Sequence, residues 1–231
     1  MIVDFSTGWK MSEWKHRGEC LLRQNLDCNY IYVNIPKNAS SWAKIQFNGR
    51  PHNYISDPVD GQYVVILRDP VTRWISGAAQ AFSGCSPQSP HFFLNIGFNA
   101  IFDHVVFDEH TAPQTMFLDE INHDRTVWFN CDSSITENWN SWIIANNLVQ
   151  QLTISTRDVN KNSYNISALA MPQSFYEWPS GESLHTGWTQ QQIIDTLTDH
   201  LNTCPIHLEQ LKNFYKKDYE LIQSIRFYDA R

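Results

Sequence analysis

The chain of 231 residues lacks the long apolar segments that mark membrane and exported proteins. No run reaches the ~18 consecutive apolar residues that a transmembrane helix requires. The N-terminal segment carries Asp4, Lys10 and Glu13 and has no apolar core of signal-peptide length. We therefore expect a soluble, cytoplasmic protein that does not insert into membranes.

Cysteine is scarce, and its spacing excludes two classes of stabilised domain. The chain has five cysteines, an odd number, and they are widely separated. This pattern fits neither a zinc motif nor a dense disulfide framework. We therefore expect reduced thiols, as in a cytoplasmic protein.

An excess of positive charge is also missing. The net charge is −7, which argues against a general nucleic-acid-binding surface but allows a local basic site for a phosphorylated small molecule. No Pro/Gly/Ser-rich linker and no internal repeat divides the chain. We expect a single α/β domain over residues 1–231, with residues 1–29 as an N-terminal extension packed on its core.

The clearest functional pattern lies in residues 30–42. An apolar, β-rich run predicts a strand over 30–35, which ends at Pro36. Small and hydroxyl-bearing residues then open a predicted helix over residues 40–47. A buried strand would thus lead through a tight turn into the start of a helix.

Such a turn is suited to anions. Backbone N–H groups at a helix start have no partner within the helix and carry partial positive charge. Lys37 adds a full charge, and Ser40 and Ser41 add hydroxyl donors. A glycan on the sequon at Asn38 would block this turn, which favours a protein that never meets the glycosylation machinery. The sequence therefore predicts a phosphate-binding turn.

A second strand–turn–helix unit follows. Residues 63–67 form a short apolar run typical of a central parallel strand, and Arg68 comes directly after it. Asp69 is a predicted N-cap, with Pro70 at the first helical position. Two such units predict a central parallel sheet flanked by helices, with both charged turns at the carboxyl ends of its strands, where ligands bind in open α/β folds.

The other expected elements are less informative about function. They include a polar connection from His52 to Gly61, a loop over 83–97, a helical stretch near 97–107 and a strand over 126–130. Further along are a capping box at Ser134–Glu137 opening a helix to about Asn147, a polar lid over 155–187, and helices over 189–202 and 205–225.

The two charged turns need a ligand with two separated anionic groups. The nucleotide-triphosphate pattern G-x-x-x-x-G-K-[ST] is missing. Residues 36–42, Pro-Lys-Asn-Ala-Ser-Ser-Trp, instead resemble the first signature of sulfotransferases that use 3′-phosphoadenosine 5′-phosphosulfate, Pro-Lys-x-Gly-Thr-Thr-Trp. Residues 68–76, Arg-Asp-Pro-Val-Thr-Arg-Trp-Ile-Ser, resemble the second signature in its carbohydrate-type form.

Two weaker similarities lie downstream. Residues 110–114, His-Thr-Ala-Pro-Gln, look like the His-x-x-Pro-Gln element of carbohydrate sulfotransferases. Residues 215–221, Tyr-Lys-Lys-Asp-Tyr-Glu-Leu, are similar to the Tyr-x-x-Asp-Phe-Glu-Leu ending of their last helix. The resemblance spans residues 30–225, and it implies the sulfotransferase fold with a P-loop-like phosphate-binding turn.

The resemblance implies roles for the residues of both turns. Lys37 would neutralise charge on the leaving oxygen during sulfuryl transfer. The turn amides and hydroxyls would hold the 5′-phosphate, and Arg68 and Ser76 the 3′-phosphate. Trp42 would stack on adenine, although core packing is the alternative. The expected donor-binding residues are Lys37, Asn38, Ala39, Ser40, Ser41, Trp42, Arg68 and Ser76.

The acceptor hydroxyl must lose a proton, and several residues are candidates for the base. The resemblance implies His52 first, because it precedes the second signature strand much as the family's base histidine often does. His110 is the second, through the His-x-x-Pro-Gln element, with Glu109 beside it as a third. Each histidine could instead be structural. Residues 160–163 could close over the nucleotide, and Arg73 is interpreted as a surface residue paired with a carboxylate.

The sequence therefore predicts sulfuryl transfer from 3′-phosphoadenosine 5′-phosphosulfate, which leaves adenosine 3′,5′-bisphosphate, to a hydroxyl acceptor without a metal. A carbohydrate is the first expectation for the acceptor; a small molecule, a lipid-linked glycan and a protein tyrosine remain alternatives. Because the carbohydrate-type relatives are membrane-bound, a microbial or viral cytoplasmic version would fit. The rival functions are a kinase with an atypical phosphate loop and a nucleotide-binding module without catalysis.

Overall fold

The chain contains two compact units. A computed structural model describes residues 22–25, 27–48, 52–55, 60–83, 101–103, 105–106, 109–118, 120–155 and 190–230. The first unit comprises Met1–Asp69, Pro113–Asn162 and Lys217–Arg231, and the second comprises Pro70–Ala112 and Ser163–Lys216. The single domain expected from the sequence stays a prediction.

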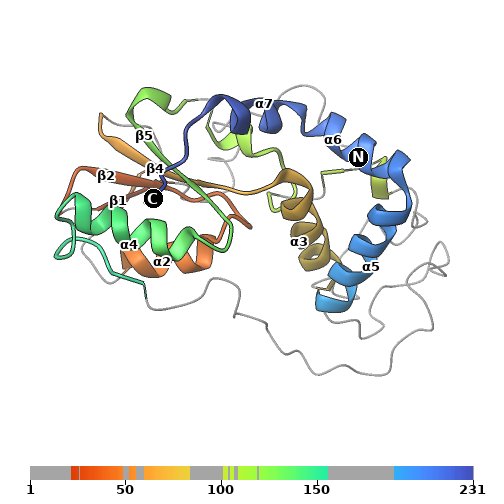
Figure 1. The fold of residues 1–231 in the computed structure, drawn as a ribbon, viewed down its shortest axis with the longest axis horizontal. Coiled ribbons are helices and arrows are strands. Elements are labelled where there is room, and N and C mark those ends of the chain that lie inside the picture. Colours follow the sequence, from red (N-terminus) through yellow and green to blue (C-terminus); the bar gives the residue numbers. More distant parts are fainter. Residues whose placement is uncertain are drawn as a thin grey trace. The chain divides into compact units, whose positions relative to one another are not determined.

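The first unit is built on a five-stranded sheet with the order β3-β1-β2-β4-β5 (Figure 1). Its strands are β1 (Leu22–Asn25), β2 (Tyr30–Val33), β3 (His52–Ile55), β4 (Gln62–Leu67) and β5 (Thr126–Asn130). Strand β4 lies between β2 and β5 and is parallel to both. Strand β1 is antiparallel to its neighbours β2 and β3. The fold is therefore α/β with a mixed sheet.

The sheet confirms three predicted strands and corrects the rest. Strands β2, β4 and β5 lie where the sequence predicted strands. The expectation of a parallel sheet is wrong for β1, part of the predicted extension, and β3, part of the predicted polar connection. Each is four residues long, and polar residues make up three of the four in Leu-Arg-Gln-Asn and the first two in His-Asn-Tyr-Ile, so neither shows a readable period of two.

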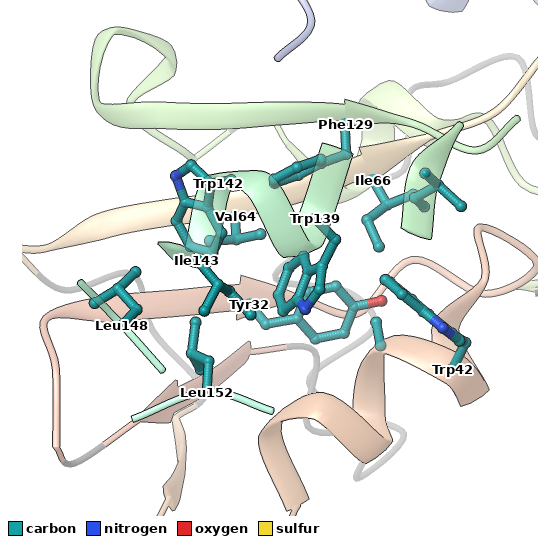
Figure 2. Packing of buried hydrophobic residues seen from close by; sticks show 12 residues of the cluster. Tyr32, Trp42, Val64, Ile66, Phe129, Trp139, Trp142, Ile143, Leu148 and Leu152 are labelled. Atoms are coloured by element: carbon teal, nitrogen blue, oxygen red, sulfur yellow. The ribbon is translucent and has the colours of Figure 1, made fainter. Parts of the chain in front are cut away.

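Two helices of the first unit cover one face of this sheet (Figure 1). They are α2 (Ser40–Asn48) and α4 (Ile135–Ala145). Figure 2 shows the core between them and the strands, in which Trp139 and Trp142 of α4 surround Tyr32 of β2 together with Trp42 of α2 and Phe129 of β5. At about 25 cal/mol per Å² of buried apolar surface, such aromatic side chains dominate the stabilisation of a core.

The start of α4 differs from the predicted capping box. Ser134 precedes the helix but its side chain does not cap it. Instead the Ser134 hydroxyl donates to Asp132 Oδ1 at 2.6 Å, and the Ser134 amide donates to the same oxygen at 2.8 Å. The Ser134 hydroxyl oxygen accepts from Asn138 Nδ2 at 3.0 Å, so this side chain is bonded to two other side chains and not to the amides of the first helical turn.

The long C-terminal helix of the prediction is two helices. They are α6 (Pro205–Phe214) and α7 (Lys216–Ser224), separated by Tyr215. The Tyr215 side chain is buried, and its hydroxyl donates to the Thr111 carbonyl at 2.5 Å. Because no proline or glycine marks the break, this tertiary contact was not visible in the sequence.

The second unit packs α3 (Pro70–Ser83), α5 (Gln190–Thr203) and α6 together. Helix α3 begins at Pro70, as predicted. Gly77 lets α3 approach the backbone at His110 closely, since a Cβ on residue 77 would lie 2.4 Å from the His110 carbonyl oxygen. The indole of Trp74 is buried and donates to the Val105 carbonyl at 2.8 Å.

Other expectations fall mainly outside the described residues. These are most of the loop over 83–97 and of the lid over 155–187, including residues 160–163, and part of the stretch near 97–107. Among the residues that the structure does describe, no helix has the length and apolar character needed to cross a membrane.

Candidate functional site

The turn between β2 and α2 contains two non-glycine residues in the left-handed backbone conformation. The Asn38 amide donates to the Ile35 carbonyl at 3.3 Å, which closes a β-turn with Pro36 at its second position. Lys37 occupies the third position with φ 66°, the left-handed conformation that type II turns require there. Ala39 is also left-handed, with φ 55°.

Helix α2 starts immediately after this turn. Its first hydrogen bond runs from the Ala43 amide to the Ala39 carbonyl at 2.9 Å. The amides of its first turn therefore have no acceptor within the helix. Ser40 is half-buried and Ser41 is exposed, so both hydroxyls are within reach of a ligand from solvent.

Asn38 holds the turn from inside the protein. Its side chain is fully buried, and Nδ2 donates to the Ile66 carbonyl at 2.8 Å and to Gln114 Oε1 at 2.5 Å. Its amide is used by the Ile35 carbonyl. Since every N–H of Asn38 is bonded within the protein, the geometry does not support its predicted contact with phosphate. The burial of its side chain also excludes a glycan on Asn38 in the folded state.

Arg68 lies directly beside the turn. It follows β4, which is the parallel neighbour of β2, and its Nη1 donates to the Lys37 carbonyl at 3.3 Å. The structure thus brings Lys37 and Arg68 together, as the parallel arrangement predicted. A guanidinium carries five N–H donors, and within the described residues this is its one side-chain hydrogen bond.

The side chain of Gln114 fixes the end of β4. Its Oε1 accepts from the Arg68 amide at 3.0 Å, and its Nε2 donates to the Arg68 carbonyl at 2.8 Å. The amide group therefore pairs with Arg68 as a neighbouring strand would. Because Gln114 also accepts from Asn38, one buried side chain positions both charged turns.

A buried carboxylate fixes Gln114 in turn. Gln114 opens the short helix η4 (Gln114–Phe117), and its amide donates to Asp218 Oδ2 of α7 at 2.8 Å. The Thr115 amide and hydroxyl donate to Asp218 Oδ1 at 2.9 Å and 2.8 Å. Asp218 is 1% exposed, so these hydrogen bonds replace its hydration. The two weaker sequence similarities, at residues 110–114 and 215–221, are therefore in contact through Gln114 and Asp218.

A third strand end completes this edge of the sheet. Cys131 follows β5, and its amide donates to the Leu67 carbonyl at 2.7 Å. Burial raises the pKa of the Cys131 thiol, and the neighbouring Arg68 charge partly opposes that rise. The thiol is free and neutral, so it adds no negative charge next to Arg68.

The structure does not bring His52 to this edge. His52 pairs with Asn25, and Asn25 lies at the level where β2 begins, whereas the Lys37 turn follows the end of β2. The strand spacings place the His52 backbone about 10 Å along the sheet from that end and two strands away. The sequence gives no signal for this position, because β3 is a short strand without a readable period of two.

Trp42 belongs to the core. It is 3% exposed, its ring packs edge-on against Trp139 at 5.5 Å, and its Nε1 donates to Ser155 Oγ at 2.9 Å. Protein atoms cover the indole, so adenine cannot stack on it. Of the two interpretations drawn from the sequence, the packing role is the one that the geometry supports.

The remaining candidates belong to the second unit. His110 is half-buried, with Nδ1 3.5 Å from Glu109 Oε1 and Nε2 3.1 Å from the Gln80 side-chain nitrogen. Ser76 is half-buried on α3, and its carbonyl accepts from Gln190. Arg73 is buried and donates to the Ala112 and Glu109 carbonyls, so its interpretation as a surface ion-pairing residue is wrong.

The carboxyl edge of the first unit therefore presents two cations beside an open helix start. Lys37 and Arg68 lie on adjacent turns, and Ser40 and Ser41 open helix α2 directly after the Lys37 turn. Such a set of donors suits a ligand with more than one negative charge. Sequence reasoning missed the positioning roles of Gln114 and Asp218, although the motifs containing them had been noticed.

Comparison with known proteins adds no relative: no family model, no curated protein and no solved structure matches this chain.

Proposed function

We propose that this chain is a sulfotransferase that moves a sulfuryl group from 3′-phosphoadenosine 5′-phosphosulfate to a hydroxyl acceptor, with a carbohydrate hydroxyl as the first expectation. One observation carries the proposal: the left-handed Lys37 turn lies against Arg68 at the carboxyl ends of adjacent parallel strands. Lys37 is the lysine of the first sulfotransferase-like signature, and Arg68 is the arginine that begins the second. Neither alone would separate this function from general anion binding.

The phosphate end of the donor fits the residues present. Lys37, Ser40 and Ser41 would hold the 5′-phosphate with the free amides of α2, and Arg68 would supply charge for a second phosphate. The adenine end does not fit Trp42, because that ring is covered. The base must therefore lie against residues other than this tryptophan.

When bound, the donor supplies a sulfuryl group joined through oxygen to its 5′-phosphate. Lys37 neutralises the negative charge that grows on this bridging oxygen as its bond to sulfur breaks and the acceptor oxygen bonds to sulfur. The turn geometry serves this role, because Pro36 and Asn38 fix the Lys37 backbone on either side. The proton of the acceptor hydroxyl passes to a base.

The candidates for this base stay His52, His110 and Glu109, and His110 has side-chain partners that suit the role. Its two ring nitrogens face Glu109 and Gln80, so the carboxylate would orient the imidazole and stabilise it once protonated. His52 lies on β3 of the first unit, two strands from β2. Glu109 is the third candidate.

Binding of nucleotides to the full chain tests the proposal. Adenosine 3′,5′-bisphosphate without Mg²⁺ should raise the Tm, whereas adenosine 5′-monophosphate should do so far less, because it lacks the second phosphate that Arg68 would hold. Stabilisation by ATP–Mg²⁺ and none by the bisphosphate would favour the kinase alternative. Bisphosphate binding without transfer of labelled sulfate to any member of a broad acceptor panel would favour a binding module.

Lys37→Ala tests the chemical step. Once an acceptor is found, this change should lower kcat by about 10²–10³-fold, as expected when a charge-stabilising donor is removed. The far-UV circular dichroism should not change, since the Lys37 side chain is not part of the core. Lys212→Ala, at an exposed lysine paired with Glu209 on α6, is the matched control and should leave kcat unchanged. Full activity of Lys37→Ala would remove Lys37 from the mechanism.

A further inference from the structure

The corner between α5 and α6 gathers three side chains that are common ligands of transition metals. His200 lies in the last turn of α5, Cys204 joins the two helices, and His207 lies in the first turn of α6 (Figure 1). One ligand atom from each lies within 4.8 Å of the others. All three belong to the second unit and take no part in the site proposed for sulfuryl transfer.

Backbone geometry explains why these residues converge. The Cys204 amide donates to the His200 carbonyl at 2.8 Å, so the two side chains are one helical turn apart on the same face. Pro205 then starts α6 as its first residue, and the chain changes direction (Figure 1). His207 follows within one turn and meets His200 across the corner.

The two imidazoles meet edge to edge. His200 Nε2 lies 2.7 Å from His207 Nδ1. In a tetrahedral zinc site with Zn–N bonds of about 2.0–2.1 Å, two such nitrogens are about 3.3 Å apart. A shift of roughly half an ångström between the rings would therefore give the two nitrogens the spacing of a tetrahedral site, and the Cys204 sulfur lies within 4.8 Å of both.

An aromatic ring orients both histidines. Phe102 stacks on His207 with a centroid distance of 4.2 Å and an interplanar angle of 11°. It also stacks on His200 at 5.1 Å and 25°. Side chains that fix the ring planes of ligands lower the ordering cost of metal binding.

We propose that His200, Cys204 and His207 bind one divalent cation of the zinc type. Two neutral imidazole nitrogens and one thiolate form a borderline-soft donor set that suits Zn²⁺ and also accepts Co²⁺. The described part of the chain contributes three residues to this group, so a water molecule completes a tetrahedral ion. Binding releases the Cys204 thiol proton to solvent. All three residues are half-buried, which leaves the ion a path from solvent.

Cobalt titration of the full-length chain tests this site. After chelation of adventitious metal, one equivalent of Co²⁺ should produce the thiolate-to-cobalt charge-transfer band and the intense visible bands of tetrahedral cobalt, and Zn²⁺ should abolish both. Cys204→Ser should remove the charge-transfer band. His200→Gln and His207→Gln should each weaken binding at least about 100-fold, since each removes a direct ligand.

Matched controls separate a site from general affinity for metals. Cys131→Ser alters another free cysteine, and His123→Gln alters a histidine outside the group; both should bind cobalt as the unaltered chain does. The absence of a charge-transfer band in the unaltered chain, or the same band in Cys204→Ser, would overturn the proposal.

A second measurement needs no variant and covers the case in which a substitution prevents folding. Mass spectrometry of the alkylated native chain should show that Zn²⁺ slows modification of Cys204 and leaves that of Cys28 unchanged. Equal rates at Cys204 with and without Zn²⁺ would contradict the site. Because neither measurement uses a nucleotide, their outcome is independent of the proposed sulfotransferase activity.

Discussion

At the scale of residues, Lys37 and Ala39 hold conformations that side chains disfavour. The left-handed region costs a residue with a Cβ about 1–2 kcal/mol, and the turn contains two such residues separated by Asn38. The surroundings stabilise this arrangement, because Asn38 is bonded to β4 and Arg68 binds the Lys37 carbonyl. Strain that the surrounding structure maintains is typical of ligand-binding turns.

Ala39→Gly tests this strain. Glycine adopts positive φ without a steric cost, so the variant should be more stable by about 1 kcal/mol, measured by urea denaturation. Ala43→Gly, four residues later inside α2, is the control and should lower stability by at least about 0.5–1 kcal/mol, because it weakens a helix. Loss of stability in both variants to the same extent would show that Ala39 is not strained.

At the scale of elements, a relay of hydrogen bonds links α7 to the site. Asp218 of α7 binds the start of η4, and Gln114 of η4 binds the end of β4 and the β2–α2 turn. The anchoring group is thus far along the chain from the turn that it supports. A short helix without its own strong capping residue depends on such a contact.

Asp218→Asn should weaken this link. In the asparagine side chain, an NH2 group replaces one of the two charged acceptor oxygens. This donor would face N–H groups that are donors themselves. We expect a loss of about 2 kcal/mol in the free energy of unfolding, since hydrogen bonds to charged groups contribute about 1.5–3 kcal/mol. Asp124→Asn, an exposed change on η5, should stay within about 0.5 kcal/mol of the unaltered chain. A change in Asp218→Asn no larger than this control would mean that the carboxylate does not anchor η4.

At the scale of the whole molecule, two thiols that are neutral in the folded state make stability depend on pH. Burial raises the pKa of both Cys28 and Cys131 above the ordinary value of 9.0. Unfolding exposes these thiols, which then ionise at lower pH than in the fold. Their contribution to stability is therefore complete below about pH 9 and decreases as the pH rises above that value.

Denaturation at alkaline pH tests this predicted decrease in stability. The free energy of unfolding should fall between pH 9 and pH 10.5 in the unaltered chain, and the fall should be smaller in Cys131→Ser, which has no thiol to ionise at that position. The control is the free energy of unfolding of Cys131→Ser at pH 7, which gives the cost of the substitution to packing alone. No Cys→Ser change at an exposed position is needed. An equal slope in both proteins would contradict the shift at Cys131.

Particular residues show how far the sequence alone could predict the site. Lys37 and Arg68 were found because a charge directly after an apolar run is a local signal, and parallel strand ends meet at one edge of a sheet. The strand position of His52 could not be predicted, because its four-residue strand has no local signal. The sulfotransferase-like motif favoured stacking for Trp42, but burial decided its role, and burial depends on Trp139 and Phe129, which are distant in the chain.

The sequence by itself determined the strands β2, β4 and β5, the starts of α2 and α3, and the cationic turns between them, because each depends on the pattern of nearby residues. Only the tertiary structure decided the mixed order of the sheet, the break at Tyr215, the Asp218–Gln114 link and the His200–Cys204–His207 group. Contacts between residues that are distant in the chain, or that meet across a helix corner, depend on packing and leave no periodic trace in the sequence.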